Sequence, residues 1–170
     1  MSEYVFLIKN TSHGQFHLMD DESYPDPSDV WTEEALTNRV AVTDGFVGIS
    51  VLQDMPEVEV TLVVGETCPA EVLAAWDHAV ECSLRVASGR LLVSPCIPMS
   101  DDEVFQVELP PGNYRLCVLC GWFDSFRITE NQREYYRIYL TQGPDSPVRV
   151  LKRRVWLDQQ RGWSDVQTLT

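Results

Sequence analysis

The residues of this 170-residue chain best suited to bind a metal or act as nucleophiles are five cysteines and three histidines. Cys117 and Cys120 are spaced as a C-x-x-C pair, which chelates zinc when the pair lies on a tight knuckle. The run that contains them, YRLCVLCGWF, predicts a long strand from Tyr114 to Phe123, and residues three apart on a strand point to opposite faces. We therefore expect buried thiols here, and neither a metal site nor a redox site.

The histidines give no firmer sign of chemistry. His13 and His17 are four residues apart in sequence, but strand geometry separates such positions by about 13 Å. The sequence contains no H-E-x-x-H motif, no glycine-rich phosphate loop and no nucleophile elbow. We expect no catalytic residue, cofactor or metal. A hydrolase whose nucleophile and base meet only in space stays open as an alternative.

Carboxylates are the most concentrated chemical groups in the chain. Seven of them lie close to Trp31 in the sequence: Asp20, Asp21, Glu22, Asp26, Asp29, Glu33 and Glu34. Asp29 or Thr32 would cap a short helix, and Glu33 and Glu34 would then lie favourably in its first turn. Local structure does not explain the other carboxylates. Two interpretations of Trp31 stay open, because a large aromatic here either plugs the end of the core or anchors a partner.

A second acidic group, Asp101-Asp102-Glu103, precedes a predicted strand. It lacks the alternate-position spacing of a calcium-binding loop. It is therefore either a solvated turn or an extension of the first acidic group. We predict a partner-binding set that contains this triplet, the seven carboxylates of positions 20–34 and Trp31.

The net charge supports a cationic partner. It is −13 overall, and residues 1–108 carry 20 acids and 4 bases (−16), whereas residues 109–170 carry 6 acids and 9 bases (+3). Such an acidic body repels phosphates, so direct binding to nucleic acid or to an anionic membrane is disfavoured. It attracts a basic protein and speeds the encounter with it. The alternative is that the acidity only confers solubility.

The elements that must position these groups are predicted to be strands. Apolar and polar residues alternate with period two along much of the chain, most clearly from Glu57 to Val64 (EVEVTLVV). Val40 to Leu52 is predicted to be mostly strand, with Gly45 and Gly48 marking a turn, a bulge or a close backbone approach. Ser88-Gly89 between two apolar runs is a hairpin signature.

Further strands are predicted at Tyr4–Ile8, Gly14–Met19, Val104–Leu109, Tyr135–Leu140 and Val148–Leu157. Besides the short capped helix near Thr32, Pro69–Trp76 indicates one or two helical turns. We predict an all-β, mostly antiparallel β-sandwich of about 8–10 strands with one or two short helical turns. It forms one domain over residues 1–170, with 158–170 as a loosely ordered tail.

The sequence also predicts a compartment. The start, MSEYVFLIKN, has no basic n-region and no cleavage site of small residues, so we expect no signal peptide. An odd number of cysteines without an export signal indicates free thiols in a reducing environment. We expect a cytoplasmic protein.

Two blocks of the sequence carry a resemblance to a known family. They are WTEEALTNRVAVTDGFVGISV, from Trp31 to Val51, and VFQVELPPGNYRLCVL, from Val104 to Leu119. In this order, with a predicted hairpin between them, they resemble the competence protein J family and related small, uncharacterised bacterial β-proteins. The PDPSD loop and the segment after Gln142 have no counterpart in that family. The resemblance implies a small bacterial protein that inhibits a DNA-entry nuclease.

Charge, composition and resemblance together favour a non-catalytic inhibitor or immunity-type protein. We expect it to bind a basic bacterial enzyme, most plausibly a nuclease or toxin domain, through its acidic surface. Two alternatives remain: a ligand-binding or structural β-domain without inhibitory function, and a hydrolase with an unrecognised site. The sequence leaves the oligomeric state open.

Overall fold

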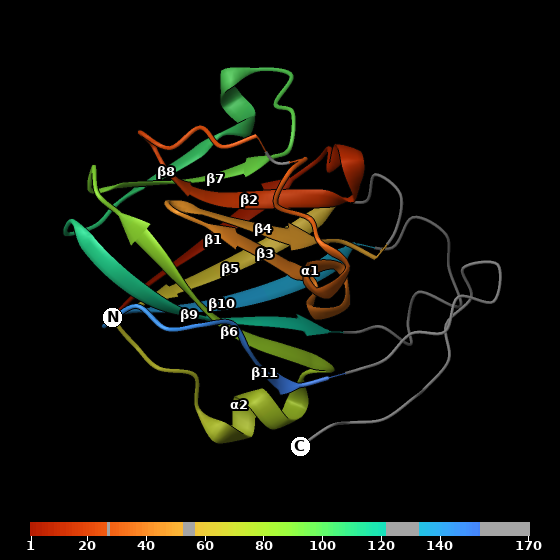
Figure 1. Cartoon of the computed structure of the whole chain (residues 1–170), viewed down its shortest axis with the longest axis vertical. Coiled ribbons are helices and arrows are strands. Elements are labelled where there is room, and N and C mark those ends of the chain that lie inside the picture. The colour runs from red at the N-terminus through yellow and green to blue at the C-terminus, as the bar shows by residue number, and fades with distance from the viewer. Residues whose placement is uncertain (27, 53–56, 122–132, 154–170) are drawn as a thin grey trace, which may run out of the picture.

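The protein folds as two β-sheets packed face to face, as the computed structural model in Figure 1 shows. The structure describes residues 1–26, 28–52, 57–121 and 133–153. The first sheet has six strands, in spatial order β1 (Ser2–Ile8), β5 (Val58–Val64), β10 (Glu134–Gln142), β9 (Gly112–Gly121), β6 (His78–Val86) and β11 (Arg149–Lys152). The second has five, in the order β3 (Val40–Thr43), β4 (Phe46–Ser50), β2 (Gln15–Asp20), β7 (Arg90–Pro95) and β8 (Phe105–Glu108).

These two sheets confirm the predicted all-β sandwich. The described residues contain eleven strands, slightly more than expected. All described pairings are antiparallel except that of β10 with β5, which is parallel. The strand predicted around Cys117 is central in its sheet, because β9 lies between β10 and β6.

The core fills the space between the inner faces of the two sheets. In β5 the alternation of EVEVTLVV is realised, because Val58, Val60 and Leu62 are fully buried while Glu59 and Thr61 between them are half-buried. Burial of such a side chain contributes roughly 1.5–3 kcal/mol. The same alternation separates the two cysteines of β9: Cys120 belongs to this core, and Cys117 packs in a smaller cluster on the outer face. The predicted divergence of the two sulfurs is confirmed.

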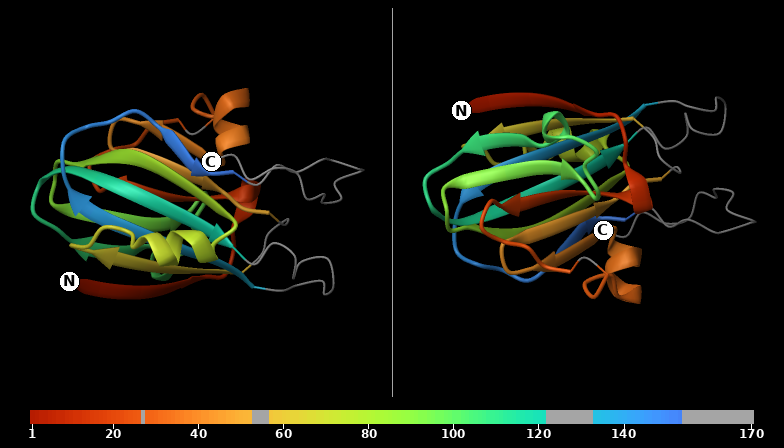
Figure 2. Two further views of the ribbon diagram at one scale, coloured as in Figure 1. Left: turned by 90° about the horizontal axis from the view of Figure 1, so that it is seen from below. Right: turned by 90° about the horizontal axis from the view of Figure 1, so that it is seen from above.

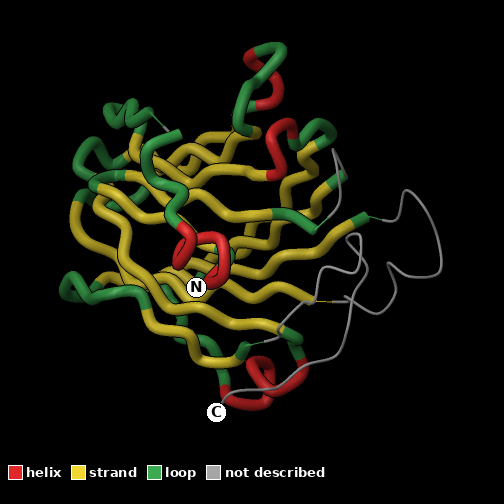
Figure 3. Tube along the Cα trace, turned by 45° about the vertical axis from the view of Figure 1, so that its right-hand side comes forward, coloured by secondary structure: helices red, strands yellow, loops and turns green. Residues whose placement is uncertain are grey.

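Among the described residues, four short helical segments lie outside the strand layers (Figure 3). They are η1 (Ser12–Gly14), α1 (Glu33–Asn38), α2 (Ala70–Ala75) and η2 (Asp101–Glu103). Helix α1 begins at Thr32, whose Oγ1 accepts a hydrogen bond of 3.1 Å from the Ala35 amide, which confirms one of the two predicted caps. Helix α2 covers the outer face of the six-stranded sheet through Leu73 and Trp76.

The two glycines of 40–52 have the expected special functions. Gly45 has a φ of 68° in the turn between β3 and β4, a conformation that suits glycine. At Gly48 a Cβ would lie 3.0 Å from Cζ2 of Trp31, so glycine there permits the indole to approach the strand closely.

The predicted hairpin at Ser88-Gly89 is wrong. Strands β6 and β7 flank this turn, but β6 pairs with β9 and β11 in one sheet, and β7 pairs with β2 and β8 in the other. Gly89, with a φ of 77°, turns the chain from one sheet to the other, and its carbonyl accepts a hydrogen bond from the Leu109 amide. The connection therefore closes the sandwich at this end.

No helix in the described part of the chain is long and apolar enough to cross a membrane. The predicted tail, 158–170, lies outside the described residues. So do the last residues of the strands predicted at Tyr114–Phe123 and Val148–Leu157.

Candidate partner-binding surface

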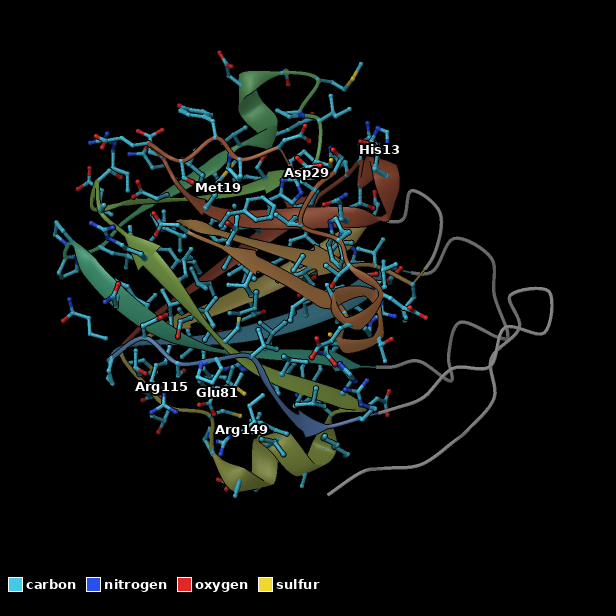
Figure 4. The ribbon with its side chains drawn as sticks, viewed as in Figure 1. His13, Met19, Asp29, Glu81, Arg115 and Arg149 are labelled. Atoms are coloured by element: carbon cyan, nitrogen blue, oxygen red, sulfur yellow. The ribbon has the colours of Figure 1, made fainter. Side chains whose placement is uncertain are left out.

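The acidic segment predicted to bind a partner runs back along the outer face of β2. We call residues 21–32 the acidic strap; Pro27 within it lies outside the described residues. The strap leaves the end of β2 at Asp20 and returns toward the start of that strand at Gln15. In Figure 4, Asp29 accordingly lies between Met19 and His13, above the strands. The loop therefore lies across the sheet with its backbone fixed at both ends.

Asp20 anchors the first end of the strap. It is only 3% exposed, and its Oδ1 accepts hydrogen bonds from the Ser88 amide (2.9 Å) and the Ser88 hydroxyl (2.6 Å). Its Oδ2 accepts a bond of 3.2 Å from the Glu22 amide. Burial acts to raise the pKa of this carboxyl, but these hydrogen bonds, with Arg90 nearby, outweigh it and leave the pKa below its ordinary value. Asp20 thus holds the strap in place, and its carboxylate does not face solvent.

Trp31 anchors the other end. Its indole Nε1 donates a hydrogen bond of 2.8 Å to Oε1 of Gln15, and the same oxygen accepts a bond of 2.7 Å from Nε2 of His17. The indole is a donor only, so the amide oxygen of Gln15 must face it. The ring is partly buried against Gly48 of β4. The ring therefore covers the sheet and is only partly buried, and its contact with a partner stays a prediction.

The other strap carboxylates are displayed to different degrees. Asp21 pairs with Arg90 at 2.6 Å and is 31% exposed, whereas Glu22, 3.7 Å from the same guanidinium, is 69% exposed. Asp26 and Asp29 are exposed. Hydrogen bonds from the Ser28 hydroxyl and amide lower the pKa of Asp26, which keeps it ionised. The strap is therefore a row of negative charges above β2.

Helix α1 extends this row. Glu33 and Glu34 are exposed in its first turn, where a negative charge favours the helix. Asp44, which the sequence reasoning missed, is 81% exposed and lies 3.9 Å from Arg85. It lines a hollow of about 200 Å³ with Asp20 and Glu22. Its only sequence signal was the Asp-Gly turn.

The predicted triplet Asp101-Asp102-Glu103 lies elsewhere. It forms η2, which follows β7, and Figure 2 shows it on the side of β1, opposite α1. Asp101 and Asp102 are exposed, and a Glu103 oxygen accepts a hydrogen bond from the Met99 amide. Among the described residues no hydrogen bond or ion pair joins η2 to the strap. The structure thus shows two separate acidic regions.

A cavity of about 320 Å³ opens beside Trp31 at the end of the strap. It is lined by His13, Gly14, Gln15, Trp31, Leu36 and Ser50. Leu36 of α1 is 57% exposed although it is apolar. Sequence reasoning did not find this cavity, because its walls come from η1, the strap, α1 and β4.

A second cavity, of about 190 Å³, lies on the outer face of the six-stranded sheet next to α2. Cys68 and Cys117 line it, together with Glu81, whose carboxylate binds Arg115 and, at 3.1 Å, Arg149. Figure 4 shows these three charged side chains together, far from the strap. Burial, first of all, and the neighbouring Cys68 raise the pKa of the Cys117 thiol. The thiols are therefore held in their protonated, unreactive form.

The surroundings of the two buried histidines, His17 and His78, indicate that both contribute to the folded structure. Burial lowers the pKa of His17 to about 4, and its ring packs edge-on to Phe46. Burial also lowers the pKa of His78 to about 4, and its Nε2 donates to the Asn38 carbonyl at 3.0 Å. Among the described residues, no group of three or more His, Cys, Asp or Glu side chains is arranged to hold a metal ion.

The fold and the strap define a class of small β-sandwich protein that presents carboxylates across the outer face of one sheet. The chain belongs to the Competence protein J (ComJ) family, whose family model matches residues 9–141. The resemblance noted in the sequence is thereby confirmed. Among curated proteins none matches the chain.

Two solved structures share the fold. One is ComJ from Bacillus subtilis, an inhibitor of the DNA degrading activity of NucA, with a TM-score of 0.59 and 19% identity over 84% of this chain and 96% of that one. The other is the product of crocagin biosynthetic gene J, with a TM-score of 0.57 and 15% identity over 85% of this chain and 100% of that one. At these identities the likeness concerns the fold.

Proposed function

We propose that this protein inhibits a bacterial nuclease by binding it through the acidic strap, without catalysing a reaction itself. The observation that carries the proposal is membership of the Competence protein J family, in which the similar ComJ structure is that of an inhibitor of a DNA-degrading protein. The net charge of −13 and the exposed carboxylates of the strap are what a basic, DNA-binding partner would recognise.

The proposed mechanism is occlusion of the nuclease active site. A nuclease binds phosphates through positively charged side chains, and a row of fixed carboxylates can occupy the same positions. Glu22, Asp26 and Asp29 are exposed on a backbone tied down at Asp20 and Trp31. A backbone held at both ends loses less conformational entropy on binding than a free loop. Electrostatic attraction then mainly sets the association rate and the choice of partner.

The proposal is tested by titrating the purified chain into DNA-cleavage assays. These assays use NucA and basic nucleases encoded near this gene. The wild-type chain should inhibit one of them with a saturable dose dependence. The double variant Asp26→Lys/Asp29→Lys should lose inhibition by about 100-fold or more, because attraction becomes repulsion at the contact. Its melting temperature should change little, because both side chains are exposed and the Asp26 carboxylate bonds only to Ser28 within the strap.

The matched control is Glu66→Lys/Glu71→Lys. It changes the net charge by the same amount at exposed positions just before α2 (Glu66) and in its first turn (Glu71), far from the strap. Retained inhibition by this control, with loss in the strap variant, assigns the contact to the strap. Equal losses of inhibition in both double variants would mean that the strap contributes only through the overall charge of the protein. A third variant, Asp101→Lys/Asp102→Lys, measures whether η2 takes part.

A further inference from the structure

The cavity beside Trp31 has a composition that the strap carboxylates alone do not explain. Its walls are the indole of Trp31, the exposed side chain of Leu36 and the small residue Gly14, with the exposed His13 and polar atoms from Gln15 and Ser50. A half-exposed leucine beside a tryptophan in water leaves apolar surface uncovered, which costs about 25 cal/mol per Å². An apolar side-chain stem that enters such a hollow covers this surface and recovers the corresponding free energy of burial.

Two of the residues that line the cavity have exposed carboxylates close to them in the sequence. Asp29 stands two residues before Trp31, and Glu33 stands one helical turn before Leu36 on the same side of α1. Both carboxylates are exposed. The Ser50 hydroxyl makes only a long hydrogen bond, 3.5 Å, to the Val51 carbonyl, so its oxygen remains available as an acceptor. The site therefore combines apolar walls with a hydroxyl acceptor, and the segments that adjoin it carry exposed carboxylates.

We propose that this cavity accepts an arginine side chain of the protein partner. The inference deepens the proposed function and rests on it. The guanidinium stacks on the Trp31 indole, the aliphatic stem of the arginine covers Leu36, and the N–H groups bind Ser50. The exposed carboxylates of Asp29 and Glu33 on the adjoining segments attract the positive charge. The volume of about 320 Å³ leaves room for one such side chain.

Arginine suits the site better than lysine. Its guanidinium is planar, more weakly hydrated and able to stack on an aromatic ring while it binds carboxylates through several donors. An ammonium group would have to give up a tightly held water shell against the apolar walls. Aromatic residues and arginine are also the types that most often dominate binding energy at protein interfaces.

The first test uses N-acetyl-arginine amide as the probe, followed by NMR of the uniformly 15N-labelled full chain. The indole N–H signal of Trp31 is assigned from its loss in Trp31→Phe. We expect a saturable shift of this signal with the arginine probe. Binding of the neutral isostere N-acetyl-citrulline amide should be about tenfold weaker or undetectable. Equal binding of the two probes, or no shift, would overturn the proposal.

Two exposed apolar residues give a matched pair of variants. Leu36 is 57% exposed beside the cavity, and Val5 is 60% exposed on β1 of the other sheet. Leu36→Lys places a competing cation at the site and should abolish the arginine-induced shift, whereas Val5→Lys should leave it unchanged. Both substitutions are at solvent-exposed positions, and lysine is a good helix former, so the fold is retained. Identical behaviour of the two variants would refute the assignment.

Nuclease inhibition then separates this proposal from the previous one. If the wild-type chain inhibits a nuclease, Leu36→Lys should weaken inhibition by about tenfold or more, and Val5→Lys should not. Inhibition that is the same for wild type and Leu36→Lys overturns the arginine site and leaves the proposed function standing. If the wild type inhibits no nuclease while the arginine probe binds as described, the proposed function fails and arginine recognition by the cavity is supported.

Discussion

The indole Nε1 of Trp31 lies 2.8 Å from Oε1 of Gln15, the first residue of β2. This hydrogen bond fixes the end of the acidic strap to the sheet beneath it. It also fixes the wall of the cavity next to α1, because Trp31 and Gln15 both line that cavity. One side-chain pair thus controls the position of the charged segment and the shape of the hollow beside it.

Replacing Gln15 by Met should therefore loosen the strap. The near-isosteric side chain removes the acceptor and leaves the donors of Trp31 and His17 without their partner, at a cost of about 1–3 kcal/mol. Urea unfolding of Gln15→Met, Trp31→Phe and the double variant measures the coupling. We expect the double variant to cost less than the sum of the two single variants. Strict additivity would mean that the bond contributes nothing.

The hydrogen bonds of Asp20 predict an acid-sensitive contribution to stability. Because its pKa is lower in the folded protein than in the unfolded chain, this contribution is complete above the unfolded pKa of about 3.9. It is lost as the pH falls through the folded pKa. Ser88→Ala removes the donor at 2.6 Å and should cost about 1–2 kcal/mol near pH 7, and less in acid.

The control for Ser88→Ala is Ser83→Ala on β6. The Ser83 hydroxyl donates to the neutral Ser146 carbonyl at 3.1 Å, so its loss should cost the same at pH 7 and pH 3. Chemical unfolding of both variants over this range measures the difference. A pH-independent cost for Ser88→Ala would show that the charge of Asp20 is not what the hydroxyl stabilises.

The buried histidines predict a second pH dependence, at less acidic pH than that of Asp20. The pKa of His17 and of His78 falls from 6.5 to about 4 on folding, so the unfolded chain binds protons between these values and the folded protein does not. Stability is therefore full above pH 6.5 and declines as the pH falls toward 4, by up to about 3 kcal/mol for each histidine.

Substituting a buried histidine removes its part of this pH dependence. His17→Gln and His78→Gln should each be less stable than the wild type at pH 7.5 and should lose less stability on going to pH 4.5. The matched control is His13→Gln at an exposed position, for which we expect the wild-type slope. Unfolding free energies from urea titrations at both pH values give the comparison. Slopes unchanged in both buried variants would contradict the assignment.

Local patterns predicted the elements but not their partners. The alternation in β5, the Thr32 cap and the divergence of Cys117 and Cys120 depend on near neighbours, and the sequence carries them directly. The turn at Gly89 has the same local composition whether its strands pair or separate. Which outcome occurs depends on β9 and β2, which compete for β6 and β7.

The candidate surface shows the same division. The sequence marks the carboxylates of the strap, but nothing near Asp20 distinguishes it from Asp21 or Glu22. Its burial depends on Ser88, 68 positions later in the chain. The cavity beside Trp31 likewise needs η1, α1 and β4 to meet. Residues brought together over such distances leave no periodic signal in one sequence.

The proposed inhibitor function predicts a strong salt dependence of the association rate. The strap carboxylates are exposed and the net charge is −13, so attraction to a basic nuclease acts through solvent, where salt screens it. The association rate constant should fall by about tenfold or more between 50 and 500 mM salt, while the dissociation rate changes little.

Stopped-flow fluorescence measures both rates for the wild type, Asp26→Lys/Asp29→Lys and Glu66→Lys/Glu71→Lys. The strap variant should have the flattest salt dependence, because the charges nearest the contact contribute most. A wild-type association rate that does not respond to salt would contradict electrostatic steering by the strap.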